Sequence, residues 1–225
     1  MWMMSYAWSL VGVLAAVARG DEVTVTLDGL GQVRGSLRGT VREFHSVPYG
    51  QAPEGELRWR SPVEVKPWDG VYDATRFGAA CAQPSGFTPT ITNTSEDCLS
   101  ITWYSPESAD GTNPVFVWIH GGGFANGGSN EARLNGTAAI SSLERETETG
   151  GGLLPVIAVI QYRLGVFGFA GSEELRDPTT NTTGNWGFED QRAALKFVNA
   201  HAKAFGGDAS NGAARGRFHA SSDVE

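Results

Sequence analysis

The sequence of 225 residues has few cysteines, no excess of basic side chains and no long apolar segment. Its 17 lysines and arginines are outnumbered by 25 aspartates and glutamates, which leaves a net charge of -8. This balance argues against a nucleic-acid partner, because a phosphate backbone is bound by a basic surface. Hydrophobic residues still make up 40% of the chain, so one sizeable globular domain with its own core is expected.

The N-terminal apolar run covers only residues 8–17 (WSLVGVLAAV). A helix that spans a membrane needs about 20 apolar residues, so a stable membrane span is not predicted. Residues 16–18 (AVA) follow the small-x-small pattern of a signal-peptide cleavage site. We therefore predict a signal peptide over residues 1–18, a mature chain from about Arg19, and a secreted, extracellular protein.

The two cysteines, Cys81 and Cys98, are compatible with a disulfide in an oxidising compartment or with two buried free thiols. Three N-x-S/T sequons begin at Asn93, Asn135 and Asn181. Each tripeptide is weak evidence alone, but behind a signal peptide the three predict N-glycosylation.

Periodicity predicts a mixed α/β sheet with an antiparallel hairpin at its N-terminal end. The hairpin is predicted from residues 23–27 and 32–37 around the turn DGLG. Other predicted strands cover residues 41–44, 99–104, 115–119 and 155–160, the last two apolar enough to be buried on both faces. Helices are predicted over residues 137–143 and 188–205, the second ended by Gly206 and Gly207. The apolar stripe predicted for the second helix consists of Phe188, Leu195, Val198, Ala202 and Phe205, widened by Ala194 and Phe197. Residues 48–89, rich in Pro, Gly and Trp, are predicted to form irregular covering loops.

Three glycines directly follow a predicted buried strand, in residues 118–124 (WIHGGGF). Without Cβ atoms, successive backbone N–H groups can converge on one anionic oxygen. A tight turn or a flexible loop remains an alternative on this segment alone. A phosphate cradle is disfavoured, because no Lys-Ser/Thr pair follows.

This segment resembles the oxyanion loop of the type-B carboxylesterase and cholinesterase family of α/β-hydrolases. Further segments that resemble the family, in the same order, are residues 47–50 (VPYG), 57–59 (LRW), 95–99 (SEDCL), 161–169 (QYRLGVFGF), 184–191 (GNWGFEDQ) and 204–208 (AFGGD). The resemblance implies the N-terminal part of an α/β-hydrolase fold, a partial domain over residues 19–211. It also implies that the N–H groups of Gly122 and Gly123 bind the oxyanion, that His120 is not the catalytic base, and that Cys81 pairs with Cys98.

The family's G-x-S-x-G nucleophile motif does not occur in the sequence. After Asn211 the sequence departs from the family, and the apolar strand before that motif is not recognisable. Residues 212–225 are therefore interpreted as a divergent tail that is not native to the fold. Ser129 lacks the final glycine of the motif, and Ser221 and Ser222 beside His219 lack a scaffold. With the serine, the acid and the histidine of the triad missing, this chain alone is predicted to be inactive.

The resemblance predicts a carboxylic ester hydrolase that acts on a small-molecule or lipid ester and needs no cofactor or metal. Two alternatives stay open: a non-catalytic binding protein on the same scaffold, and a non-functional fragment that aggregates through unpaired strand edges. Arg163 and Asp190 are predicted to be structural, as an ion pair or a cap. His45 and His201 lie in segments that match the family and are predicted to be solvated or locally hydrogen-bonded. Phe124 either lines an acyl pocket or packs.

Overall fold

The computed structural model describes residues 21–86, 88, 90–147 and 152–216, with backbone only over residues 214–216. The predicted signal peptide and residues 217–225, including His219, Ser221 and Ser222, lie outside the described residues.

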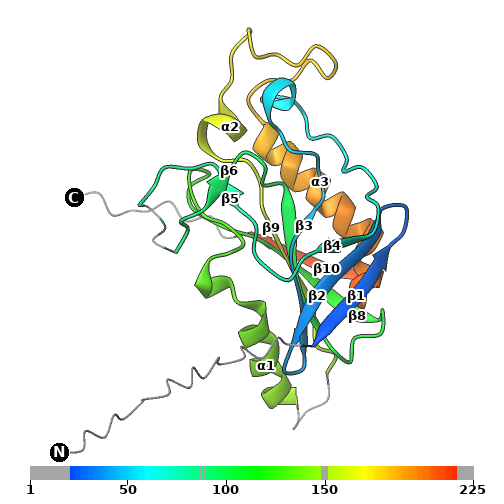
Figure 1. Ribbon diagram of the computed structural model, residues 1–225. Coiled ribbons are helices and arrows are strands. Elements are labelled where there is room, and N and C mark those ends of the chain that lie inside the picture. The colour runs from blue at the N-terminus through cyan, green and yellow to red at the C-terminus, as the bar shows by residue number, and fades with distance from the viewer. Residues whose placement is uncertain (1–20, 87, 89, 148–151, 217–225) are drawn as a thin grey trace, which may run out of the picture.

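The fold is built on one mixed sheet (Figure 1). Its strands, in the order in which they lie side by side, are β1 (Glu22–Leu27), β2 (Gly31–Arg38), β3 (Val41–Pro48), β7 (Ser100–Pro106), β9 (Val156–Ile160), β8 (Asn113–Ile119) and β10 (Gly207–Gly216). The pairs from β1 to β9 are antiparallel, and β9, β8 and β10 run parallel. The short strand β4 (Val71–Asp73) pairs in parallel with β2, and β5 (Ala80–Cys81) with β6 (Thr94–Ser95) forms a separate small sheet.

The N-terminal hairpin is confirmed, with Val25 opposite Val33 and Leu27 opposite Gly31. The turn between the two strands contains Gly29 at a φ of +78°, a conformation that favours glycine. The prediction of irregular loops over residues 48–89 is wrong in part, because β4 and β5 lie there. Both are too short to leave a periodic pattern in the sequence.

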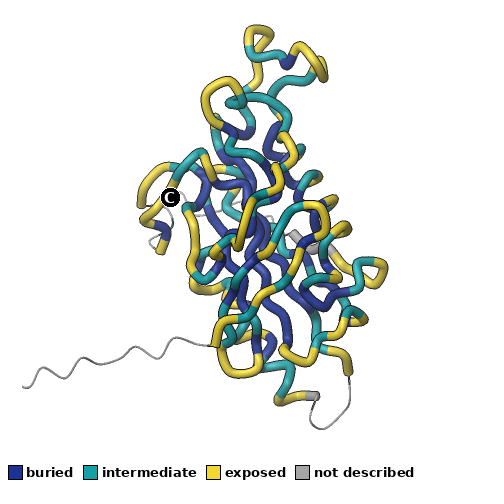
Figure 2. Tube along the Cα trace, turned by 45° about the vertical axis from the view of Figure 1, so that its right-hand side comes forward, coloured by how far each residue is buried: buried dark blue, intermediate teal, exposed yellow. Residues whose placement is uncertain are grey.

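Helices cover both faces of the sheet (Figure 1). Along β9, Val156, Ala158 and Ile160 belong to a core cluster that includes residues of α3 (Trp186–His201), whereas Ile157 and Val159 pack with Ile140 of α1 (Gly136–Thr147). Alternate side chains of a strand point to opposite faces, so the two helices lie on opposite sides. All five residues of β9 are buried, and Figure 2 shows the buried chain passing through the centre of the molecule.

The remaining helices are short: α2 (Gly165–Phe169), and the 3-10 helices η1 (Gly55–Leu57), η2 (Ala132–Leu134) and η3 (Ala202–Phe205). The long helix ends as predicted, with Gly206 in the left-handed conformation at φ +88°. Its predicted apolar stripe is wrong at Phe188, which is 46% exposed. Ala194, Phe197 and Val198 of the predicted stripe are buried, and Trp186 and Asp190 are buried in addition, because a buried ion pair sets the rotation of the helix.

The absence of a strand after Asn211 was predicted wrongly, because β10 continues to Gly216 and pairs with β8 over residues 115–119. Backbone N–H and C=O groups form this ladder, so small residues suffice where an apolar segment was expected. The register shifts between Asp208 and Gly212. That residues 212–225 are not native to the fold stays a prediction.

Candidate functional site

The three glycines form a loop directly after β8, which we call the triglycine loop (residues 120–127). Because β8 and β9 are parallel, their carboxyl ends meet at one edge of the sheet. The segment after β9, residues 161–165, therefore lies beside the triglycine loop. Ligands of open α/β sheets bind at such carboxyl edges.

The backbone of this loop requires glycine at Gly122 for steric reasons. Its φ is +127°, and a Cβ there would lie 1.9 Å from the carbonyl oxygen of Asn126. The carbonyl oxygen of Gly122 accepts hydrogen bonds from the N–H groups of Ala125 (3.0 Å) and Asn126 (3.2 Å), which close the turn. Gly123 has a φ of +59°, but a Cβ there would meet no atom within 4 Å.

The N–H groups of Gly122 and Gly123 donate no hydrogen bond to any part of the chain that the structure describes. Gly122 is partly buried and Gly123 is exposed. Two adjacent donors without internal partners can bind an anionic oxygen at no cost to an existing bond. That they form an oxyanion hole stays a prediction.

His120 is a structural member of the loop. It is 2% exposed, and its carbonyl oxygen accepts a hydrogen bond from the Tyr162 hydroxyl at 3.0 Å. The two rings stack with centroids 4.6 Å apart. Burial lowers the pKa of His120, and its Nδ1 donates to the carbonyl oxygen of Gly121 at 3.1 Å. Its Nε2 is buried without a hydrogen-bond partner among the described residues, and that His120 is not the catalytic base stays a prediction.

The disulfide between Cys81 and Cys98 is confirmed, and the alternative of two free thiols is wrong. It lies two residues from Gln83, whose Nε2 donates to the carbonyl oxygens of Cys81 (3.0 Å) and Gly127 (2.8 Å). The Oε1 atom of Gln83 accepts from the N–H of Gly127 at 2.9 Å. A Cβ on Gly127 would lie 2.5 Å from His120 Nδ1, so this glycine fits tightly against the loop. Gln83 therefore connects the disulfide to the triglycine loop.

Replacing Gln83 by alanine should loosen the triglycine loop. The change removes both bonds to Gly127, and we expect hydrogen exchange of the amides of residues 121–127 to accelerate about 10-fold. Exchange measured by mass spectrometry on peptides covering this loop checks the expectation. Gln83→Glu is the matched control: it keeps an acceptor for the Gly127 N–H but no donor, so an intermediate rate is expected. Unchanged exchange in Gln83→Ala would show that Gln83 does not hold the loop.

Aromatic rings surround the outer end of the loop. Phe124, at φ +61°, packs its ring against Phe169 (centroids 5.1 Å apart) and Phe188 (5.3 Å). Its carbonyl oxygen accepts a hydrogen bond from the N–H of Gly165 at 2.7 Å. Of the two roles left open for Phe124, packing is thus present, and the other stays a prediction. The exposure of Phe188 leaves one ring of this group open to solvent.

A buried ion pair anchors the segment beside the loop to α3. Arg163 Nε and Nη2 each lie 2.8 Å from Asp190 carboxylate oxygens, and the backbone N–H of Arg163 donates to the same carboxylate at 3.0 Å. The two side chains are 3% and 0% exposed. Burial raises the pKa of Asp190, and the Arg163 guanidinium opposes that rise. The predicted structural role is confirmed, and the pair fixes Tyr162 and Gly165 on either side of Arg163.

Other residues named from the sequence lie away from this loop or are engaged elsewhere. Ser129 is 1% exposed, with its hydroxyl 3.3 Å from that of Thr102, so it is not placed as a nucleophile. His45 is locally hydrogen-bonded to Glu43, as predicted, and the ring of His201 packs on that of Phe197. The sequon residues Asn93, Asn135 and Asn181 are all exposed. Among the described residues, no group of three or more His, Cys, Asp or Glu side chains could hold a metal ion.

Sequence reasoning did not identify Gln83, Tyr162 or Gly165 as supports of the loop. Tyr162 and Gly165 stand in a segment that resembles the family, but nothing in that segment shows which atoms they contact. The proximity of Gln83 to Cys81 was the only local signal for its role.

Comparison with known proteins places these features in a family. The model of the Carboxylesterase family matches residues 21–213. The chain is 34% identical to para-nitrobenzyl esterase of Bacillus subtilis (strain 168), over 80% of this chain and 35% of that protein. It is 36% identical to human cocaine esterase, over 86% of this chain and 34% of the relative. Rat thyroglobulin is also 36% identical, over 82% of this chain but only 6% of that protein.

Solved structures agree with the sequence matches. A Geobacillus stearothermophilus carboxylesterase, EST55, superposes with a TM-score of 0.72 and 36% identity, over 86% of this chain and 38% of that one. A PNB esterase superposes with a TM-score of 0.74 and 33% identity, over 87% and 38% of the two chains. The α/β-hydrolase fold predicted from the sequence is thereby confirmed. The chain spans little more than a third of the esterases that it matches.

Proposed function

Because the chain belongs to the carboxylesterase family, we propose that it supplies the oxyanion-binding part of a carboxylic ester hydrolase. The observation that carries the proposal is the pair of N–H groups at Gly122 and Gly123, which have no partner among the described residues. The loop that bears them is held by its own turn, by Gln83 and by the segment after β9.

In the proposed reaction, a serine hydroxyl attacks the carbonyl carbon of an ester, and a histidine takes the serine proton. The carbonyl oxygen becomes an oxyanion, and the two glycine N–H groups donate hydrogen bonds to it. Each such donor typically contributes about 3 kcal/mol to the barrier reduction. The tetrahedral intermediate then expels the alcohol, and water hydrolyses the acyl-enzyme.

The 225 residues alone are proposed to be inactive. They contain no G-x-S-x-G motif, and Ser129, the serine nearest to the triglycine loop in sequence, is buried against Thr102. An oxyanion forms only after a nucleophile has attacked, so donors without a nucleophile cannot start the reaction.

Labelling with a fluorophosphonate probe tests this inactivity. The purified chain should incorporate no more probe when folded than after denaturation, because no activated serine is present. Full-length para-nitrobenzyl esterase of Bacillus subtilis serves as the positive control. Labelling of the folded chain that denaturation abolishes would contradict the proposal.

We further propose that the chain is exported and N-glycosylated, and that it acts on a small-molecule or lipid ester. Residues 1–18 have the pattern of a signal peptide, and all three sequon asparagines are exposed. The disulfide agrees with an oxidising compartment. Among the described residues, no helix has the length and apolar character needed to cross a membrane.

A further inference from the structure

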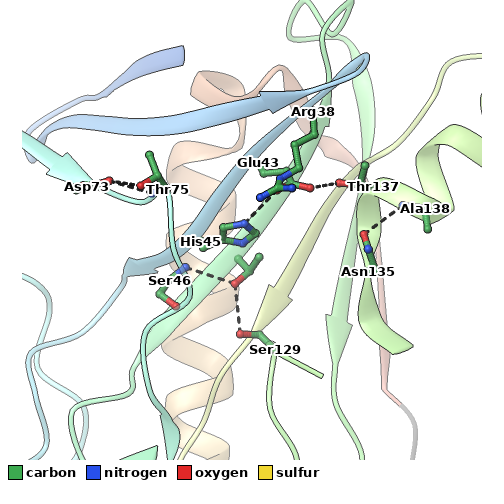
Figure 3. Close-up of polar contacts among 11 residues, drawn as sticks. Arg38, Glu43, His45, Ser46, Asp73, Thr75, Ser129, Asn135, Thr137 and Ala138 are labelled. Atoms are coloured by element: carbon green, nitrogen blue, oxygen red, sulfur yellow. Dashed lines mark hydrogen bonds and ion pairs between the residues drawn. The ribbon is translucent and has the colours of Figure 1, made fainter. Parts of the chain in front are cut away.

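A cleft of about 490 Å³ lies on the same side of the sheet as α1 and shares no lining residue with the triglycine loop. Its walls come from β3, from the loop at residues 75–77 and from the segment that leads into α1. The lining residues that matter below are Glu43, His45, Phe77, Asn130 and Asn135. Figure 3 shows Glu43 and His45 of β3 next to each other, and Asn135 just before α1 with its hydrogen bond to Ala138.

The floor of the cleft is an ordered polar network around Glu43. This carboxylate is 5% exposed and accepts hydrogen bonds from the Thr137 hydroxyl and from His45 Nε2 at 3.2 Å, beside Arg38 Nε at 2.8 Å. Burial alone would raise the pKa of Glu43, but these donors outweigh it and the pKa is lowered. Because an ionised carboxylate only accepts hydrogen bonds, His45 Nε2 is the donor in its contact with Glu43.

Two buried polar atoms beside this network lack hydrogen-bond partners among the described residues. They are Nδ1 of His45 and Oδ1 of Asn130, and the second is an acceptor. Phe77 lies over the imidazole, with ring centroids 3.9 Å apart, and is 43% exposed. The cleft is thus lined by a partly exposed aromatic ring, Phe77, and by Asn130, whose side-chain oxygen is an unpartnered acceptor.

Asn135 is one of the residues that line this cleft. Its Oδ1 accepts a hydrogen bond from the N–H of Ala138 at 3.2 Å and so caps α1. This bond fixes the amide plane, and Nδ2 makes no hydrogen bond to the described residues. Asn135 is the first residue of a sequon, and Nδ2 is the atom that carries an N-linked glycan.

We propose that the innermost N-acetylglucosamine of a glycan on Asn135 is seated in this cleft, with one face of the sugar on Phe77. The hydroxyl and acetamido N–H groups of the sugar are donors, the type of group that Asn130 Oδ1 lacks. Attachment forms a bond between Nδ2 and C1 of the sugar, breaks the sugar–phosphate bond of a lipid diphosphate donor, and releases the Nδ2 proton. The inference rests on the export proposed above.

The fold also sets when this sugar is attached. The Thr137 hydroxyl of the sequon is bound to Glu43, and Gly136 packs so tightly that a Cβ would lie 2.3 Å from the Tyr104 ring. A transferase cannot engage the sequon in this state, so attachment precedes the packing of α1.

The test uses the full chain with only the Asn135 sequon, as the variant Asn93→Gln/Asn181→Gly, secreted from eukaryotic cells. Glycine suits position 181, where φ is +56°. Peptide mass spectrometry measures occupancy. An endoglycosidase then leaves one sugar on Asn135, and an amidase removes the glycan entirely from a parallel sample. Both samples are prepared again with Phe77→Ala.

The single sugar should raise the melting temperature by about 3 °C with Phe77 present and by less than about 1 °C with Phe77→Ala. The conversion of Asn135 to aspartate by the amidase is common to both backgrounds and cancels.

A control chain whose only sequon is at Asn181 should show no such dependence on Phe77. Equal changes of melting temperature with Phe77 and with Phe77→Ala would contradict the contact between the sugar and Phe77. An unoccupied Asn135 in the secreted chain would overturn the use of this sequon, and a failure of secretion would overturn the export. None of these outcomes bears on the proposed oxyanion site.

Discussion

Replacing Gly122 by alanine in a completed hydrolase should lower kcat by about 100- to 1,000-fold, the usual loss when one oxyanion donor is removed. The completed protein joins residues 21–206 of this chain to the part of para-nitrobenzyl esterase that follows the matched region and carries its serine. The added Cβ would lie 1.9 Å from the Asn126 carbonyl oxygen, so the turn must open and the N–H groups must leave their positions. Hydrolysis of a p-nitrophenyl ester measures the loss.

Gly123→Ala is the matched control for that experiment. A Cβ at this position meets no atom within 4 Å, so the turn can stay closed. Alanine at this position must adopt a left-handed backbone conformation, which lowers the stability of the folded protein by about 1–2 kcal/mol. This penalty does not change the activation barrier of the reaction. We expect kcat to fall less than about 10-fold. Equal losses in the two variants would contradict a role for the precise geometry of Gly122.

Replacing Asp190 by asparagine should destabilise the chain by about 3–5 kcal/mol, because Arg163 would remain buried without a counter-charge. Folded domains are stable by only about 5–15 kcal/mol, so a large part of the total is lost. The amide also places a donor against the guanidinium and the Arg163 N–H, which now donate to the carboxylate. Urea denaturation followed by far-ultraviolet circular dichroism measures the loss.

Two further variants make the Asp190 experiment specific. Glu173→Gln breaks the Arg176–Glu173 pair, in which the carboxylate side chain is 75% exposed, and should cost less than about 1 kcal/mol. Arg163→Met combined with Asp190→Leu removes both charges and should recover part of the stability lost in Asp190→Asn. A loss below about 1 kcal/mol in Asp190→Asn would show that the pair does not anchor the segment beside the triglycine loop.

The sequence predicted those parts of the fold whose signal is local. The strands β8 and β9 were recognisable as apolar runs, and the hairpin from alternation around a turn. The strand β10 was not, because its pairing with β8 is made by the backbone of a segment rich in glycine and alanine. The rotation of α3 was also misjudged at Phe188, since the anchor of that helix is a charged residue, Asp190, that hydrophobic periodicity does not weigh.

The candidate site was predictable as a segment but not as a geometry. Gly122 and Gly123 look alike in sequence, yet a Cβ would strike the turn at Gly122 and would meet no atom within 4 Å at Gly123. The hydrogen bonds from Gln83 to Gly127 join residues 44 positions apart in the sequence. The spacing of apolar residues along the chain cannot predict such a contact. The resemblance supplied the expected role of Gly122 and Gly123, and the contacts show what holds their loop in place.

The most direct test of the central claim is the amide proton shift of Gly122 and Gly123 when a phosphonate inhibitor reacts with the completed hydrolase. The phosphonyl oxygen of the adduct stands where the oxyanion forms, so both amide protons should move downfield on adduct formation, because new charge-assisted hydrogen bonds are made. In the 225-residue chain alone the same inhibitor should leave both resonances unchanged. Unchanged Gly122 and Gly123 resonances in the phosphonylated, folded protein would contradict the account.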